Sequence, residues 1–161
     1  NGTDDPEFLI STNPGEPVKP LGKVASGGEL SRIMLAIKTV LADQDAIETL
    51  IFDEIDSGIS GRTAQMVSQK MKLLAKTHQI ICITHLPQIA AFADNHIHIE
   101  KQSADGRTVT QLTTLDYNGR LQELVRMTAG ATASRAAFES ATELLQGAEQ
   151  IKSSLKRLQE K

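Results

Sequence analysis

Two short apolar runs constrain the fold of this chain more than any other feature of its sequence. Residues 49–52 read Thr-Leu-Ile-Phe and residues 80–83 read Ile-Ile-Cys-Ile. Uninterrupted runs of this kind are typical of strands that are buried on both faces of a parallel sheet. Between the runs, apolar residues recur at helical spacing and predict a helix with a buried face formed by Ala64, Val67, Met71 and Leu74. Strand, helix and strand in this order predict a right-handed βαβ unit.

A second helix is predicted to begin at Ser26. Ser26 and Glu29 have the spacing of a capping box, in which each side chain accepts a hydrogen bond from the backbone N–H of the other residue. Apolar residues then follow at helical spacing and predict a buried face made of Leu30, Ile33, Met34, Ile37 and Leu41. Before this helix, the run at residues 8–10 suits a strand, and the Asn-Pro-Gly sequence at residues 13–15 predicts a turn.

An alternating pattern after the second apolar run predicts a hairpin. Residues 96–99 read His-Ile-His-Ile, and Val109 and Leu112 lie in a later, Thr-rich run. Asp105 and Gly106 between the two runs form a turn signal. We therefore predict an α/β fold with a mostly parallel sheet, helices on both faces and this hairpin at the edge of the sheet.

The C-terminal part of the sequence favours helices. A short helix is expected around residues 121–125, and a longer one from about residue 132, ending in a polar tail at residues 152–161. We divide the chain accordingly into a lobe at residues 1–130 and a C-terminal helix with its tail at residues 131–161. Three arginines in this part, interpreted as solvated helix residues rather than DNA contacts, are Arg120, Arg126 and Arg135.

The composition is that of a globular chain with an aliphatic core. Of the 161 residues, 40% are hydrophobic and 3% are aromatic, so Ile, Leu, Val, Ala and Met must build the core. The single Cys82, interpreted as an inert core residue, excludes an internal disulfide and fits a reducing cytoplasm. The net charge of −3 does not indicate a basic surface for nucleic acid. No apolar run reaches the ~18 residues that a membrane-spanning helix requires.

Chemistry is expected where the two predicted strands end. Asp53 and Glu54 follow the first run, and His85 follows the second by two residues. Ligands of open α/β sheets bind beyond the carboxyl ends of the strands, where one carboxylate can hold Mg²⁺ and a neighbour can orient or deprotonate a water. Each of these residues, taken alone, fits an ordinary polar strand end at least as well. If the two strands are neighbours, Glu54 and His85 lie at the same edge of the sheet.

The predicted start of the second helix is suited to an anion. Free N–H groups and the positive end of the helix dipole favour negative charge there. Gly27 and Gly28 let a phosphate approach the backbone closely. The alternative is a helix that is merely well capped, and Glu29 supports that alternative; the two are compatible. All three features occur in order within about 60 residues, a span that fits a helix followed by a βαβ unit.

Together these features resemble the head of ABC-type ATPases. Residues 25–32, Ala-Ser-Gly-Gly-Glu-Leu-Ser-Arg, resemble the ABC signature, and residues 50–54, Leu-Ile-Phe-Asp-Glu, resemble Walker B with its catalytic Glu. Residues 57–60 stand at the D-loop position and residues 84–85 at the H-loop position. The resemblance implies a P-loop NTPase-like fold, of which this chain would form the C-terminal lobe.

The resemblance narrows further within that superfamily. Residues 53–56, Asp-Glu-Ile-Asp, resemble the SMC-like branch, because ABC transporters usually carry Pro directly after the Glu. Residues 8–16 together with residues 24–32 resemble the RecN family of bacterial DNA repair proteins. This resemblance extends over roughly residues 7–130. It implies an ATPase in the recombinational repair of DNA double-strand breaks.

The resemblance also implies roles for single residues. Asp53 would coordinate Mg²⁺, largely through water, Glu54 would be the general base, and His85 would sense the γ-phosphate of ATP. The signature would bind ATP held by a second head, through Ser26, Gly27, Gly28 and Glu29. The D-loop would lie across the interface between the heads and contribute Ser57 and Gly58. Its sequence, Ser-Gly-Ile-Ser, departs from the transporter form ending in Leu-Asp, so its detailed contacts are not carried over.

One element of a complete site is missing from the sequence. The phosphate-binding pattern G-x-x-x-x-G-K-[ST] does not occur, since Gly22-Lys23 is followed by Val24 and lacks the preceding Gly. The resemblance places that loop in an N-terminal lobe of the same protein. The other implied partners are a second head in a homodimer and DNA, without a membrane, in a cytoplasmic and nucleoid-associated setting. We therefore expect no significant ATPase activity from the chain alone.

Two other functions are compatible with parts of the pattern. One is a non-catalytic interaction module that keeps the fold; the paired carboxylates Asp53 and Glu54 argue against it. The other is a fragment of an ABC transporter, which Ile55 after Glu54 disfavours. A metal site at His96 and His98 would need a third ligand, and none stands at a useful spacing.

Overall fold

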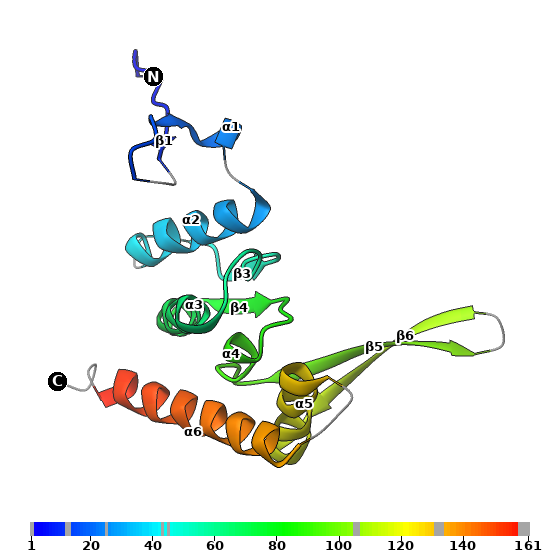
Figure 1. Ribbon diagram of the computed structural model, residues 1–161. Helices are drawn as coiled ribbons and strands as arrows, with labels where there is room; N and C mark the ends of the chain where they lie inside the picture. Colours follow the sequence, from blue (N-terminus) through cyan, green and yellow to red (C-terminus); the bar gives the residue numbers. More distant parts are fainter. Residues whose placement is uncertain are drawn as a thin grey trace.

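The computed structural model describes residues 2–11, 14–24, 26–42, 44, 46–104, 107–130 and 134–157. Helices and strands are mixed along the chain, which confirms the predicted α/β class (Figure 1). In chain order the elements are β1 (Leu9–Ile10), β2 (Lys19–Pro20), α1 (Leu21–Val24), α2 (Gly27–Val40), β3 (Thr49–Phe52), α3 (Gly61–Leu74), β4 (Gln79–Cys82), α4 (Pro87–Ala90), β5 (His96–Ala104), β6 (Arg107–Leu115), α5 (Tyr117–Ala129) and α6 (Arg135–Arg157).

The predicted βαβ unit is present. Strands β3 and β4 pair in parallel, from Thr49 beside Gln79 to Phe52 beside Cys82, and α3 connects them. Their inward side chains join residues of three helices in one core. The buried members of this core are Leu35, Phe52, Ile55, Ala64, Val67, Met71, Leu74 and Ile89. The four positions predicted for the buried face of α3 are all among them.

Among the described residues, the other face of this small sheet stays exposed, which corrects the prediction of helices on both faces. Leu50 and Phe52 point toward the helices, whereas Ile51 between them is 67% exposed. Ile81 and Ile83 on the neighbouring strand are 45% and 53% exposed. The apolar runs fit burial on both sides, but α2, α3 and α4 supply core residues to one side only. We call Ile51, Ile81 and Ile83 the open face.

Helix α2 also departs from its predicted burial. Its core contact is Leu35, while Leu30, Met34 and Leu41 of the predicted apolar face are exposed. The helix is therefore rotated about its axis relative to the prediction. Its apolar residues lie on more than one side, and only the side that contains Leu35 faces the core of the described residues. The exposed side forms a second apolar surface.

A second core joins the C-terminal helices. Leu124 and Val125 of α5 pack with the end of α4 and with the alanine-rich side of α6, which contributes Ala137, Ala141, Leu145 and Ala148. The small side chains allow α5 and α6 to approach closely. The predicted boundary at residue 130 thus falls between two helices that share a core, and the division itself stays a prediction.

The predicted hairpin is confirmed, with one correction. Strands β5 and β6 pair antiparallel over nine residues each, from His96 beside Leu115 to Ala104 beside Arg107. This ribbon forms a sheet of its own rather than an edge of the β3–β4 sheet, because α4 and the turn after it carry the chain away before β5 begins. It projects from the helices in Figure 1. The predicted Asp105–Gly106 turn lies outside the described residues.

The three arginines behave differently from one another. Arg120 donates from Nη2 to the carbonyl oxygens of Ala91 and Ala93, at 3.1 and 2.9 Å, and so ties α5 to the end of α4. Its interpretation as a solvated residue is therefore wrong. Arg126 and Arg135 make ion pairs within their own helices, with Glu123 and Glu139. Among the described helices, none combines the length and apolar character needed to cross a bilayer.

The core around β3 can be tested by removing one side chain. Leu74 is 1% exposed at the end of α3, and we expect Leu74→Ala to lower the free energy of unfolding by about 2–5 kcal/mol through lost burial and the remaining cavity. The control is Val40, which is 83% exposed at the end of α2. Val40→Ala should change the free energy of unfolding by less than about 0.5 kcal/mol. Urea denaturation of both variants measures the difference; equal effects would contradict the assigned core.

Candidate functional site

The start of α2 is closed by the predicted capping box. The backbone N–H of Ser26 donates to Oε2 of Glu29 at 2.9 Å, and the N–H of Glu29 donates to Oγ of Ser26 at 3.3 Å. The N–H of Ser26, together with the Ser26 hydroxyl that also donates to Oε2 at 3.1 Å, holds the pKa of the Glu29 carboxyl below its ordinary value. The predicted site residues Ser26, Gly27, Gly28 and Glu29 thus form the N-cap and the first turn of α2.

The turn after β3 is bound tightly to α2. Ser31 donates its Oγ hydrogen to the carbonyl oxygen of Asp53 at 2.8 Å. Arg32 donates from Nη1 to the carbonyl oxygens of Ile55 and Ser57, at 3.1 and 2.8 Å. We call residues 53–57 the strand-tip turn. Sequence reasoning did not give Ser31 and Arg32 a role, because nothing in local spacing links them to residues more than twenty positions away.

Close approach to the same turn requires Gly28. A Cβ atom at Gly28 would lie 2.8 Å from the carbonyl oxygen of Glu54 and 2.8 Å from Cβ of Ser57. A Cβ atom at Gly27 would meet only the end of the exposed Glu54 side chain, which can move. Gly28 therefore has a packing role beside the phosphate role predicted from sequence. The Glu54 carboxylate lies against the first residue of α2, where the helix dipole favours negative charge.

Glu54 occupies an unusual backbone conformation. Its φ is +57°, a left-handed geometry that costs a non-glycine residue of the order of 1–3 kcal/mol. The N–H of Glu54 donates to Oδ1 of Asp53 at 2.9 Å, and its carbonyl oxygen accepts from the N–H of Ser57 at 2.9 Å. The sharp turn ends β3 and leaves both carboxylates exposed. Ser57 and Gly58 are exposed directly after it.

The ends of β3 and β4 are neighbours, as the sequence analysis required. The ladder continues one step past the strands, with the N–H of Ile83 donating to the carbonyl oxygen of Phe52 at 3.0 Å. Thr84 and His85 then lie beside the strand-tip turn. Residues from α2, from the turn after β3 and from the turn after β4 therefore meet at one edge of the sheet.

A buried carboxylate links the two turns. Oδ2 of Asp56 accepts hydrogen bonds from Thr84 Oγ1 at 2.6 Å and from the N–H of His85 at 2.9 Å, and lies 3.0 Å from Nδ1 of His85. Burial alone would raise the pKa of Asp56, but these partners outweigh it and hold the pKa below its ordinary value. Sequence reasoning used Asp56 only as a mark of the family, and missed this contact across 28 residues.

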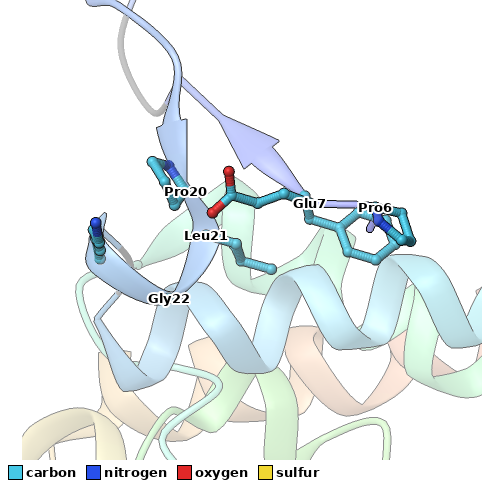
Figure 2. A pocket seen from close by; sticks show the side chains of 7 residues that line it. Pro6, Glu7, Pro20, Leu21 and Gly22 are labelled. Atoms are coloured by element: carbon cyan, nitrogen blue, oxygen red, sulfur yellow. The ribbon is translucent and has the colours of Figure 1, made fainter. Parts of the chain in front are cut away.

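Two other features are not among the predicted site residues. Burial raises the pKa of the Cys82 thiol to about 12, and the nearby carboxylates of Asp56 and Asp53 act in the same direction, so the thiol is protonated and inert at neutral pH. A hollow of about 440 Å³ lies at the N-terminal segment. Figure 2 shows the side chains that line it, above a helix of the ribbon. Its lining contains none of the predicted site residues and consists of Pro6, Glu7, Phe8, Pro20, Leu21, Gly22 and Lys23.

Known proteins similar to this chain are bacterial DNA repair proteins. It is 49% identical over 152 residues to the DNA repair protein RecN of Halalkalibacterium halodurans, which covers 94% of this chain and 27% of that protein. For the RecN proteins of Bacillus subtilis and Treponema pallidum, the identities are 49% over 151 residues and 52% over 144 residues. The chain belongs to the RecN family. It spans about a quarter of the length of these RecN relatives, and no family model matches it.

A solved structure supports the fold. The described chain is similar to an SMC ATPase from a structural study of the ATP-driven dimerization and DNA-stimulated activation of SMC ATPases. The TM-score is 0.50 at 21% identity, and the match covers 77% of this chain and 81% of that one. The predicted P-loop NTPase-like fold of the ABC and SMC type is thereby confirmed for this RecN segment.

The packing role of Gly28 gives a direct test. Gly28→Ala places a methyl group against the carbonyl oxygen of Glu54 and Cβ of Ser57, which can move only if the backbone of the turn moves. We therefore expect a loss of about 1–3 kcal/mol in the free energy of unfolding. Gly147 in α6 is the matched control, since a Cβ there meets nothing within 4 Å. Gly147→Ala should stabilise the chain by up to about 1 kcal/mol. Thermal unfolding of both variants measures the two changes in stability. A Gly28→Ala variant that is more stable than the native chain would refute the packing role.

The Asp56 contact predicts a pH dependence of stability. A carboxyl with a lowered pKa in the folded state stabilises the fold at neutral pH, and this contribution is lost as the pH falls below about 4, through the folded pKa. Asp56→Asn should cost about 1–3 kcal/mol at pH 7, and the difference from the native chain should shrink on acidification. Urea unfolding at pH 7 and at pH values below 4 measures it. A difference that is constant with pH would contradict the ionised Asp56.

Proposed function

We propose that this chain supplies one half of a composite ATPase site in a RecN-like protein that repairs DNA double-strand breaks by recombination. The observation that carries the proposal is the meeting of three elements at one edge of the sheet. The first turn of α2, the strand-tip turn and His85 each contribute a polar group there. A P-loop lobe of the same protein would supply the other half, with the groups that hold the β- and γ-phosphates.

The residues fit the chemistry of phosphoryl transfer. Asp53 is an exposed carboxylate that would hold Mg²⁺ through water; it would act together with phosphate oxygens, because the described residues form no group of three or more metal-ligating side chains. Glu54 is the general base of the proposal. Its carboxylate is exposed at the tip of β3, where it would orient or deprotonate the water that attacks the γ-phosphate held by the P-loop lobe.

The remaining site residues would bind ATP held by a second head. The N–H groups of Gly27 and Gly28 at the start of α2 would donate to a phosphate, with Ser26 and Glu29 ordering the turn. Ser57 and Gly58 are exposed beside them. ATP would then join two heads of a homodimer, and its hydrolysis would separate them. Dimerization driven by ATP is a property of the SMC ATPases to which the fold is similar.

The open face supports the P-loop lobe as partner. Ile51, Ile81 and Ile83 form an exposed apolar surface on adjacent strands, of the kind that marks an interaction site. The RecN relatives are about four times as long as the matched region, so most of their chain lies outside it. A lobe from that remainder, packed on the open face, would complete the sheet on its second side.

We propose that the whole protein acts on DNA, but that this chain does not itself provide the DNA-binding surface. The relatives are DNA repair proteins, whereas this chain carries a net charge of −3. The positive charge that binds phosphates would then come from other parts of the protein. A location in the cytoplasm, at the nucleoid, follows from this proposed role.

Reconstitution of the two lobes tests the proposal. ATP hydrolysis is measured for this chain, for a separately produced P-loop lobe of the same protein and for their mixture. We expect turnover only in the mixture, and a loss of at least tenfold with Glu54→Gln or Ser26→Arg. Lys101→Ala on the ribbon is the control and should keep the rate. Turnover by the chain alone that disappears in Glu54→Gln would refute the division of the site.

A mixture that hydrolyses ATP equally with all variants would also contradict the proposal. It would favour the alternative of a non-catalytic interaction module, in which the fold serves to bind a partner.

The proposed docking of the second lobe has its own test. Ile81→Asp places a charge in the open face, and we expect it to weaken binding of the P-loop lobe at least tenfold in a calorimetric titration, because burying an unpaired charge is costly. Met66→Asp is the control, since Met66 is also exposed but lies on α3, which packs on the opposite face. Equal affinities for the two variants would show that the lobe binds elsewhere.

A further inference from the structure

The contact between Asp56 and His85 has a defined geometry. The side chain of Asp56 is 5% exposed, and that of His85 is 75% exposed. Nδ1 of His85 lies 3.0 Å from the same Oδ2 that accepts from the Thr84 hydroxyl and from the His85 N–H. A buried carboxylate oxygen therefore lies beside one edge of the imidazole, while most of the ring faces outward.

The contact decides which nitrogen of His85 carries hydrogen. An ionised carboxylate accepts hydrogen bonds and cannot donate them. Asp56 is ionised at neutral pH, because its partners hold its pKa below the ordinary value. An Nδ1 without hydrogen would turn its lone pair toward this anion 3.0 Å away, so the ion-pair geometry favours hydrogen on Nδ1. A neutral imidazole has one N–H only, so Nε2 carries no hydrogen and is an acceptor.

We propose that Asp56 is a positioning residue that fixes the orientation and the tautomer of His85, so that neutral His85 presents Nε2 as a hydrogen-bond acceptor at the edge of the sheet. This inference rests on the proposed function for its consequence in the ATP site. There, neutral His85 accepts a hydrogen bond from the attacking water. It donates to a phosphate oxygen only as an imidazolium, with both nitrogens protonated and Asp56 balancing the charge.

The remaining contacts show why Asp56 rather than another residue has this role. Thr84 Oγ1 donates to Asp56 and accepts from the N–H of Leu86 at 3.0 Å, so the turn that leads into α4 is held on both sides. An amide oxygen could replace the acceptor in these contacts. Only a carboxylate lacks any hydrogen to offer Nδ1, whereas the NH₂ group of an asparagine can donate to it and favour a proton on Nε2.

The tautomer is measurable in the 161-residue chain without nucleotide. Histidine is labelled with ¹⁵N, and two-bond ¹⁵N–¹H correlations are recorded at about pH 8.5, roughly two units above the ordinary pKa of an imidazole. His85→Gln identifies the signals of His85 among the four histidines. We expect His85 to carry its hydrogen on Nδ1 in the native chain and predominantly on Nε2 in Asp56→Asn. Glu54→Gln, a neighbouring change of equal charge, should leave the Nδ1–H form in place.

The native spectrum decides even if Asp56→Asn does not fold. A native His85 with its hydrogen on Nε2 overturns the inference. Thr84→Val provides a second variant, since it removes one donor but keeps the carboxylate, and should retain the Nδ1–H form. The proposed function fails separately: if His85→Gln and Glu54→Gln both leave the reconstituted ATPase rate unchanged, the ATP-site role is wrong, whereas the tautomer result stands on the spectrum alone.

Discussion

The strand-tip turn at residues 53–57 is the element on which the rest of the site depends, and it is held from two sides. From α2, Ser31 and Arg32 donate to its carbonyl oxygens, and Gly28 allows the backbones to touch. From β4, Thr84 and His85 donate to its buried Asp56. These contacts bring the three polar segments together at one edge of the sheet. The cost of the left-handed Glu54 is met by this surrounding structure.

Much of the fold followed from local physics. The capping box at Ser26, the βαβ unit and the antiparallel ribbon depend on spacing within a few residues, and each is present. The neighbouring strand tips followed from the parallel pairing. Burial was less predictable. The apolar runs predicted Ile51 and Ile81 to be buried, but both are exposed, and no described residues cover them. The roles of Arg32 and Asp56 depend on partners more than twenty positions away, which no local pattern reveals.

The exposed apolar residues and the polar edge have a common explanation in a larger assembly. The open face and the exposed side of α2 expose more contiguous apolar surface than is usual for a chain that makes no contact with another protein part. The chain matches about a quarter of the length of its RecN relatives, and the proposed P-loop lobe is a part of the remainder. In that account, apolar contacts join the lobes, and the polar edge stays accessible to the nucleotide that joins two heads.

Hydrogen exchange of the backbone amides tests this account most directly. The Glu54→Gln chain, which should bind ATP without hydrolysing it, is mixed with the P-loop lobe and measured with and without ATP and Mg²⁺. The account predicts slower exchange on the open-face strands whenever the lobe is present, and additional slowing at residues 26–29 and 84–86 only when nucleotide is added. Exchange that is insensitive to nucleotide at those two segments would contradict the proposed site, even if the lobe protects the open face.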